Sequence, residues 1–182
     1  RWVNRKHIER LSESDFCAHL KPYVEQSSTV RDKEWDVGSV LPRISPLIRE
    51  RIETFGDATA LFDAGEFNFC FERPRLTDPS HLVWTKTQDK YTDQEARRIT
   101  AEHIREIEAR LTELPTDDVT TATVKDAVWP YADEKGRGEV LWPFRYALSG
   151  RERSPDPFEI TSCIGANEAR ERLEAARDAL QT

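Results

Sequence analysis

The sequence predicts an all-α protein, an orthogonal bundle of roughly eight to ten helices. Three observations favour this fold class. Apolar residues recur at helical spacing, S-x-x-D and T-x-x-E capping boxes open two of the expected helices, and no long segment alternates apolar and polar residues like a strand. The chain has 182 residues, of which 34% are charged, so it is large enough to bury a core beneath broad solvated helix faces.

The first part of the chain is expected to form short amphipathic helices. Ser12 and Asp15 make the first capping box, and the helix that follows should bend or break at Pro22. Residues 40–54 carry an apolar residue at every fourth position, so they are predicted to be helical in spite of two internal prolines. The aromatic run EFNFCF at 66–71 alternates like a strand, but we expect it to close a small helical core.

The second part contains the clearest helix. Thr92 and Glu95 make the other capping box, and apolar residues follow at helical spacing as far as Pro115. Residues 72–92 combine prolines with polar residues and have no period, so they are the best candidate for a linker.

Further helices are expected between the long helix and the end of the chain. Ser154 followed by Pro155 is a typical N-cap and first-turn pair, and Asn167 is expected to cap the last helix. Three glycines are expected to end three of the helices before the last one: Gly136, Gly150 and Gly165.

The usual signatures of catalysis and of metal binding are missing. The three cysteines form no CxxC pair, and the four histidines lie far apart outside any HExxH pattern, so we expect no metal site. The motifs of nucleotide hydrolysis, dinucleotide binding and α/β-hydrolase chemistry are also missing. The odd cysteine count fits a reducing cytoplasm. The sequence has no run of 18 apolar residues, so no membrane span is predicted. A chain that begins with Arg1 and has no methionine is expected to be part of a longer protein.

Basic residues gather between positions 135 and 153 of an otherwise acidic chain. The formal net charge is -7, but this segment holds five basic and two acidic residues, a local charge of +3. A ligand in a groove responds to charges within a Debye length of about 8 Å, so a basic patch can act on an acidic protein. The basic residues are Lys135, Arg137, Arg145, Arg151 and Arg153.

Two interpretations of this segment remain open on pattern alone. Arginine forks onto phosphates and stacks on bases, and aromatic residues interleave with the arginines here, which indicates an RNA interface. Alternatively, the aromatic residues belong to the core, Arg145 is paired within its helix, and Arg151 and Arg153 solvate a loop.

Four segments, in this order along the whole chain, resemble the C-terminal anticodon-binding region of bacterial glutamyl-tRNA synthetases. They are WVN at 2–4, PLIRERIETF at 46–55, LWPFRYALSGRERSP at 141–155, and FE at 158–159 ahead of Gly165. The LWPxRxALSGxxxSP string is the most specific of these motifs.

The resemblance implies a helical cage of two tightly joined subdomains, residues 1–76 and 77–182, that grips the anticodon arm of the glutamate-accepting tRNA. In that family a Rossmann catalytic domain with HIGH-like and KMSKS-like motifs precedes this region, and neither motif occurs in this sequence. The chain is therefore expected to be a fragment of an ATP-dependent glutamate–tRNA ligase, with no catalytic residue or cofactor of its own. ATP and magnesium would belong to the catalytic domain, which would be its partner in a cytoplasmic, monomeric enzyme.

The resemblance also assigns residues to the RNA. Arg51 matches an arginine that contacts the last anticodon base and helps to reject the glutamine tRNA, and a planar fork suits that task because it can donate two hydrogen bonds to a base edge. Arg145 matches a residue of the anticodon pocket, and Ser154 and Pro155 match a loop that holds bases. Candidates for contacts with the RNA backbone are Arg43, Arg49, Lys135, Arg137, Arg151 and Arg153.

The sequence departs from the family where SPGLFE is usual and SPDPFE stands at 154–159. Asp156 could repel phosphate, accept a hydrogen bond from a base amino group, or simply be a first-turn acid favoured by the helix dipole. Pro157 removes an amide donor at the same place. The carboxylate and the net charge of -7 also suit a rival hypothesis, a helical protein-interaction scaffold that has lost RNA binding and attracts a basic partner.

Overall fold

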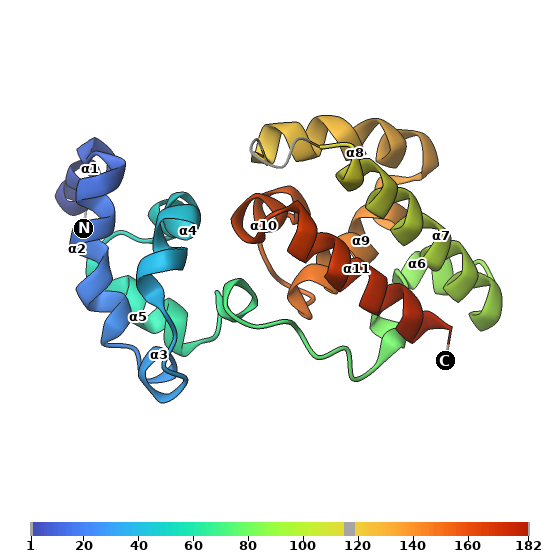
Figure 1. Cartoon of the computed structure of the whole chain (residues 1–182), viewed down its shortest axis with the longest axis horizontal. Coiled ribbons are helices and arrows are strands. Elements are labelled where there is room, and N and C mark those ends of the chain that lie inside the picture. The colour runs from blue at the N-terminus through green and yellow to red at the C-terminus, as the bar shows by residue number, and fades with distance from the viewer. Residues whose placement is uncertain (1, 115–118, 182) are drawn as a thin grey trace. The chain divides into compact units, whose positions relative to one another are not determined.

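The computed structural model describes residues 2–114 and 119–181, with side chains from residue 5 onward. Within these ranges the chain forms helices and no strand, which confirms the all-α prediction (Figure 1). The α-helices are α1 (Trp2–Arg10), α2 (Glu13–Glu25), α3 (Ser28–Asp32), α4 (Val37–Arg51), α5 (Phe55–Asp63), α6 (Thr85–Gln88), α7 (Asp93–Thr112), α8 (Thr121–Lys135), α9 (Arg137–Ser149), α10 (Pro157–Ile164) and α11 (Ala166–Leu180). Two short 3₁₀ helices are η1 (Asn68–Cys70) and η2 (Pro79–Leu82).

The chain divides into two compact units, Arg1–Glu72 and Arg73–Thr182. The first unit holds α1 to α5 and η1, and the second holds η2 and α6 to α11. The sequence places the boundary after residue 76. Each unit has its own buried core, and the two are described separately.

The core of the first unit forms where α2 packs against α4 and α5. Phe16, Leu20 and Val24 recur along one side of α2 and are fully buried, as their spacing predicts. Of the two outcomes predicted at Pro22, a bend or a break, the break is wrong, because α2 continues through this residue to Glu25. Pro22 itself is exposed, and the burial of Leu20 and Val24 on either side of it holds the helix together.

Helix α4, which carries Arg51, begins earlier than predicted. The sequence predicts a helix over 40–54, whereas α4 spans Val37–Arg51. The helix begins at Val37 because the Asp36 carboxylate accepts hydrogen bonds from two backbone N–H groups of the first turn, at 3.1 and 3.4 Å. It ends at Arg51 because Ile52 is extended, with φ -108° and ψ 145°.

The aromatic run at 66–71 closes the core of the first unit, as predicted. Phe67 and Phe69 are buried, and the ring centroids of Phe62 and Phe67 lie 5.3 Å apart. The 3₁₀ helix η1 turns the chain directly after Phe67 and carries Phe69. The alternation in the sequence therefore reflects a tight turn with aromatic residues on its inner side.

Helix α9 is central in the second unit, where it contacts α7, α8, α10 and α11. Its residues Val140, Phe144 and Ala147 are fully buried. Helix α7 packs along α11 and begins with the predicted capping box, in which the Thr92 hydroxyl accepts from the Glu95 N–H and the Glu95 carboxylate accepts from the Thr92 N–H. Leu141, Trp142 and Arg145 of α9 are left half-exposed.

The linker predicted over 72–92 is wrong for its second half. Helices η2 and α6 lie within it, and Leu82, Val83 and Thr87 are buried in the second unit. Both helices are too short to give a periodic pattern, so only the tertiary packing identifies them.

Two predicted helix caps are also wrong. Asp156, and not Ser154, is the N-cap of α10: its carboxylate accepts from the Glu159 N–H at 2.8 Å, and the Glu159 carboxylate accepts from the Asp156 N–H at 3.3 Å. Gly165, with φ 87°, lies between α10 and α11 and caps both, so Asn167 lies inside α11.

Some features fall outside this description or concern only part of the chain. The expected helix end at Pro115 and the side chains of the WVN motif lie outside the described residues. Among the described residues, no helix is long and apolar enough to cross a membrane. In the same part of the chain, no group of three or more His, Cys, Asp and Glu side chains is arranged to hold a metal ion.

Candidate nucleic-acid interface

A hollow of about 350 Å³ opens on the second unit between three segments that are distant in sequence. One wall is the half-exposed side of α9, the second is the loop that leads into α10, and the third is Trp84 at the start of α6. The lining residues are Trp84, Arg137, Gly138, Leu141, Trp142, Arg145, Ser154, Asp156 and Pro157. Three of the residues assigned to the RNA from the sequence, Arg137, Arg145 and Ser154, are thus brought together.

Arg145 and Trp142 form the centre of this hollow. The guanidinium carbon of Arg145 lies 5.1 Å from the centroid of the Trp142 ring, within the range of a cation–π contact. Arg145 Nη2 also donates to the carbonyl oxygen of Glu152 at 2.7 Å, so the arginine ties the loop to α9. Most of its N–H donors remain for a ligand, and they are oriented before any ligand arrives.

The loop ahead of α10 shapes the hollow, but Pro155 does not line it. Pro155 is buried and is not among the lining residues, so its side chain is not presented to a ligand there, and its assignment as a base reader stays a prediction. Ser154 is half-buried and its hydroxyl donates to the Pro155 carbonyl at 3.0 Å. The Asp156 carboxylate lies at the edge of the hollow and is occupied by the capping hydrogen bond described above.

The basic residues around the hollow differ in what they already contact. Arg137 donates to Asp133 at 2.9 and 2.6 Å, and Lys135 pairs with Glu134 at 2.8 Å. Exposed pairs of this kind contribute about 0–1 kcal/mol to stability. A phosphate can therefore replace the acidic partner, Asp133 or Glu134, at little cost. Arg153 is exposed on the loop.

Arg151 has a different setting from Arg153 on the same loop. It is half-buried, and its backbone N–H donates to the hydroxyl of Ser149 at 3.2 Å. The Ser149 hydroxyl in turn donates to the Arg145 carbonyl at 2.8 Å, so Ser149 links the last turn of α9 to the start of the loop. The loop is therefore held to the end of α9.

Arg49 in the first unit has a structural role, and its assignment to the RNA backbone stays a prediction. Its guanidinium donates to the carbonyl oxygens of Ile8 and Leu11 at 3.4 and 2.9 Å and to that of Ser12 at 3.4 Å. Its central carbon lies 4.2 Å from the ring centroid of Phe16. These contacts satisfy carbonyl groups at the end of α1 and leave the guanidinium little capacity for RNA.

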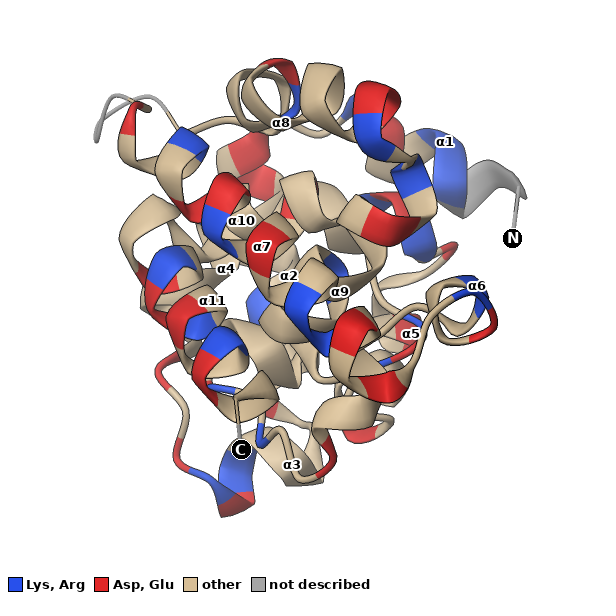
Figure 2. Cartoon of the chain, turned by 90° about the vertical axis from the view of Figure 1, so that its right-hand side faces the viewer, with Lys and Arg blue, Asp and Glu red and all other residues tan. Residues whose placement is uncertain are grey.

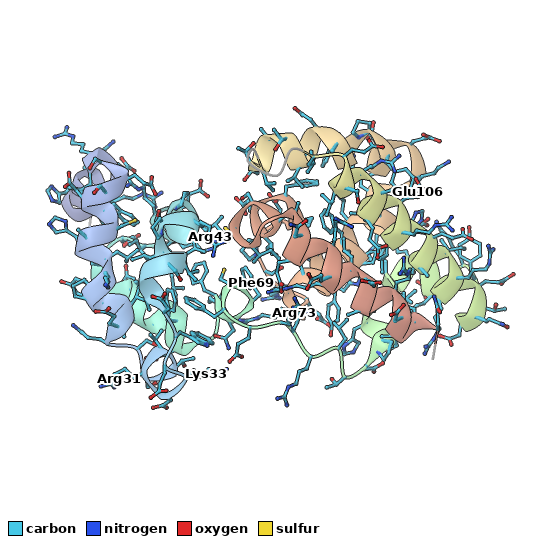
Figure 3. All side chains as sticks on the ribbon, in the orientation of Figure 1. Arg31, Lys33, Arg43, Phe69, Arg73 and Glu106 are labelled. Carbon is cyan, nitrogen blue, oxygen red and sulfur yellow. The ribbon has the colours of Figure 1, made fainter. Side chains whose placement is uncertain are left out.

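Arg51 and Arg43 lie on the same helix but reach solvent. Arg51 is exposed in the last turn of α4, donates once to the Leu47 carbonyl at 3.2 Å, and lies 5.9 Å from the Phe67 ring centroid. Arg43 is exposed in the middle of α4 (Figure 3). Of these two contacts, only the one with the Leu47 carbonyl uses an N–H donor of Arg51. The guanidinium can therefore still fork onto a base edge.

Elsewhere on the second unit, opposite charges are mixed and largely paired. Figure 2 shows basic and acidic residues interspersed along α7 and α11. Three arginines of α7 pair with an acid one turn away on the same helix, at 3.0, 2.7 and 2.8 Å: Arg97 with Asp93, Arg98 with Glu102, and Arg110 with Glu106. The basic loop beside the hollow is therefore distinct from the neutralised surface of α7.

Sequence reasoning missed Trp84, because the segment that contains it was assigned to a linker. The only signal was a tryptophan within a polar stretch, and nothing in the local pattern relates it to α9. Its position on the hollow follows from the packing of η2 and α6 against the second unit.

Comparison with known proteins identifies the family. A family model described as an anticodon binding domain matches residues 15–177. The chain belongs to the anticodon-binding domain family. The matched region includes every residue that lines the hollow, so this hollow lies within the anticodon-binding domain.

Proteins similar to this anticodon-binding domain are named as glutamate–tRNA ligases. That of Lachnoclostridium phytofermentans is 26% identical over all of this chain and 34% of its own length. That of Deinococcus radiodurans is 28% identical over 97% of this chain and 33% of its own length. The chain thus spans about a third of the curated relatives it matches.

A solved structure supports the fold. The crystal structure of a glutamate tRNA ligase from Elizabethkingia meningosepticum aligns with a TM-score of 0.65 and 22% identity, over 98% of this chain and 32% of that chain.

Proposed function

We propose that this chain is the anticodon-recognition module of a glutamate–tRNA ligase and that it binds the anticodon loop of the glutamate tRNA during translation. The observation that carries the proposal is the hollow in which Arg145 stacks on Trp142 with most of its donors unused, inside a domain of the anticodon-binding family. Unpaired loop bases present flat faces and polar edges, and a stacked arginine matches both.

The residues divide into base readers and phosphate contacts. Arg145 and Ser154 would read bases at the hollow, and Arg51 would read the last anticodon base. Exposed basic side chains are suited to phosphates, which they would contact without regard to sequence. These are Arg43, Lys135, Arg137 and Arg153, with Arg151 as a half-buried member of the same loop.

Asp156 is compatible with this role. Its carboxylate accepts from the Glu159 N–H and stands at the positive end of the α10 dipole, which supports its interpretation as a first-turn acid. Pro157 occupies the first position of the helix, where no intrahelical N–H bond is required. The departure from the usual SPGLFE pattern therefore preserves the turn that borders the hollow.

The remaining parts of the ligase reaction lie beyond this chain in the proposal. A catalytic domain of the same protein would bind ATP, magnesium and glutamate, and the whole enzyme would act as a monomer in the cytoplasm. The relatives are about three times the length of this chain, which leaves room for such a domain.

The scaffold hypothesis is less well supported. A surface that attracts a basic partner needs unpaired acids, whereas acids of α7 are paired with arginines of the same helix. Both the family and the similar proteins point to tRNA instead.

The test is binding of the chain to the anticodon stem-loop of the glutamate tRNA, compared with a hairpin that has the same stem and an unrelated loop, at two salt concentrations. We expect tighter binding to the anticodon loop at both concentrations. Arg153→Ala should weaken binding to both RNAs and reduce the slope of log affinity against log salt concentration by about 0.7–0.9, the effect of one phosphate contact. The matched control is Arg31→Ala, at an exposed position on α3. Equal affinity for the two hairpins would contradict sequence reading by this chain.

A further inference from the structure

The hollow beside Arg145 has a second aromatic wall that comes from outside α9. Trp84 is the N-cap residue of α6 and is half-buried, so part of its indole ring reaches the hollow. No role in RNA binding follows from the sequence for this residue. Its surroundings bear on whether it only fills space or also presents a face to a ligand.

The ring of Trp84 rests directly on the backbone of α9. A methyl group added at Gly138 would lie 2.4 Å from Cη2 and Cζ2 of the indole, far inside van der Waals contact. Only a glycine allows this approach, because any side chain would displace the ring. Gly138 is one helical turn before Trp142 on the same side of α9. The Trp84 ring therefore lies against the turn of α9 next to the one that carries Trp142.

The two tryptophans are also fixed relative to each other. Trp142 Nε1 donates to the carbonyl oxygen of His81 at 2.8 Å, which links α9 to η2. Leu82 and Val83, immediately before Trp84, are buried at 0% and 3% exposure. The segment that leads to Trp84 is therefore anchored in the second unit, and the ring is oriented before a ligand binds.

Each of these rings has a cation close to it. Lys86 Nζ lies 5.3 Å from the centroid of Trp84, and the guanidinium carbon of Arg145 lies 5.1 Å from that of Trp142. Two aromatic surfaces with two cations suit a ligand that has a flat π face and an attached negative charge. The volume of about 350 Å³ is at the small end of the roughly 300–1,000 Å³ of ligand sites, so it suits one flat ring system.

We infer that Trp84 is a stacking residue for one unpaired base of the bound RNA loop, and that Gly138 positions it. The inference rests on the proposed function, since it names one more residue of the same site. Trp84 supplies affinity through the base face, whereas Arg145 supplies specificity through the base edge. Stacking of this kind depends little on which base is present, because every base has a π face.

The experiment is a double-mutant cycle between Trp84→Ala and anticodon loops in which one nucleotide at a time is abasic. We expect Trp84→Ala to weaken binding to the intact loop by about tenfold or more. At one abasic position the wild-type and variant chains should bind equally, since the stacking partner is already missing there. Tyr91→Ala, an aromatic residue that is 42% exposed and outside the hollow, is the matched control and should bind like wild type.

Two further variants separate stacking from loss of fold. Trp84→Phe keeps a smaller aromatic face and should lose less affinity than Trp84→Ala. Gly138→Ala retains every side chain of the hollow and places a better helix former in α9, yet it should weaken binding by displacing the Trp84 ring. Far-UV circular dichroism and thermal melting of each variant report whether the helices remain folded.

The outcomes distinguish the inference from the function on which it rests. If the wild-type chain binds the loop but the loss caused by Trp84→Ala is the same for every abasic loop, Trp84 has only a packing role and the inference is overturned. Unchanged affinity of Trp84→Ala would overturn it as well. If the wild-type chain shows no preference for the anticodon loop, the proposed function fails and the assignment of Trp84 fails with it.

Discussion

Residues of the same type, two positions apart, serve different purposes in this chain. Arg49 and Arg51 both lie in the last turn of α4, but positions i and i+2 of a helix point to different sides. Arg49 faces α1 and the core residue Phe16, whereas Arg51 faces solvent. The sequence shows both as basic residues at a helix end, and only the position of α1 separates a structural arginine from a candidate base reader.

Arg49→Ala is predicted to destabilise the first unit. Three carbonyl groups lose a charged donor and Phe16 loses a cation–π partner, so we expect the free energy of unfolding to fall by about 2–3 kcal/mol. Urea unfolding followed by circular dichroism measures it. Arg51→Gln, on the exposed side of the same turn, is the control and should change stability by less than about 0.5 kcal/mol. Equal stability of the two variants would show that the Arg49 contacts contribute nothing.

His103 is predicted to make the stability of the second unit depend on pH. It is 8% exposed, its Nδ1 is 2.8 Å from the Tyr131 hydroxyl, and among the described residues its Nε2 has no hydrogen-bond partner. Burial lowers the pKa of His103 below its usual value of about 6.5, although nearby Glu139 and Glu102 oppose the shift. The unfolded chain therefore takes up the proton first, so stability is retained above about pH 6.5 and declines as the pH falls below it.

The measurement is the free energy of unfolding of the wild-type chain relative to His103→Gln at pH 7.5, 6.5 and 5.5. The advantage of the wild type should shrink as the pH falls, because glutamine does not titrate. A difference between wild type and His103→Gln that is the same at all three pH values would contradict a neutral buried imidazole.

At the scale of the helices, local signals predicted starts well where they were complete. The box at Thr92–Glu95 forms as predicted, and at Ser12–Asp15 the Ser12 hydroxyl caps α2 by accepting from the Asp15 N–H, because each depends on hydrogen bonds within four consecutive residues. Ser154 was a poorer guide, since Asp156 two residues later has its own partner at Glu159 and a proline at the first helical position. Where two polar residues compete to cap one helix, the complete box prevails.

Asp156→Ala is predicted to weaken α10. Loss of the hydrogen bond to the Glu159 N–H should lower the free energy of unfolding by about 1 kcal/mol, whereas Asp156→Asn should lower it less because asparagine also caps. Thermal or urea unfolding of the three chains measures the effect. If Asp156→Ala is as stable as wild type, the capping box is not what begins this helix.

The candidate site could be predicted only in part. The arginine-aromatic pattern of 141–155 lies on one helix and its following loop, which is why the predicted base readers Arg145 and Ser154 line the same hollow; their contact with RNA stays a prediction. Trp84 could not be found, because its contact with Gly138 joins segments more than fifty residues apart and depends on two short helices that packing stabilises. The burial of Pro155 likewise follows from the fold of the loop and not from its composition.

At the scale of the whole molecule, the candidate base readers are distributed over both units. Arg51 belongs to the first unit, and Arg145, Ser154 and Trp84 belong to the second. Specificity for the last anticodon base and affinity for the rest of the loop should therefore be separable by mutation. Arg51 would determine the preference for the last anticodon base, and the residues of the hollow would determine the affinity and base preference for the rest of the loop.

The most direct measurement is the ratio of the affinities of the chain for the cognate anticodon stem-loop and for a loop whose third anticodon base is changed, in wild type and in Arg51→Gln. We expect wild type to prefer the cognate loop by about 5- to 150-fold, the effect of one good bidentate contact, and Arg51→Gln to lose most of this preference while it keeps its fold. Arg43→Gln, on the same helix, is the control and should retain the preference. An identical preference in wild type and Arg51→Gln would contradict base reading by Arg51, and no preference in wild type would contradict anticodon recognition by this chain.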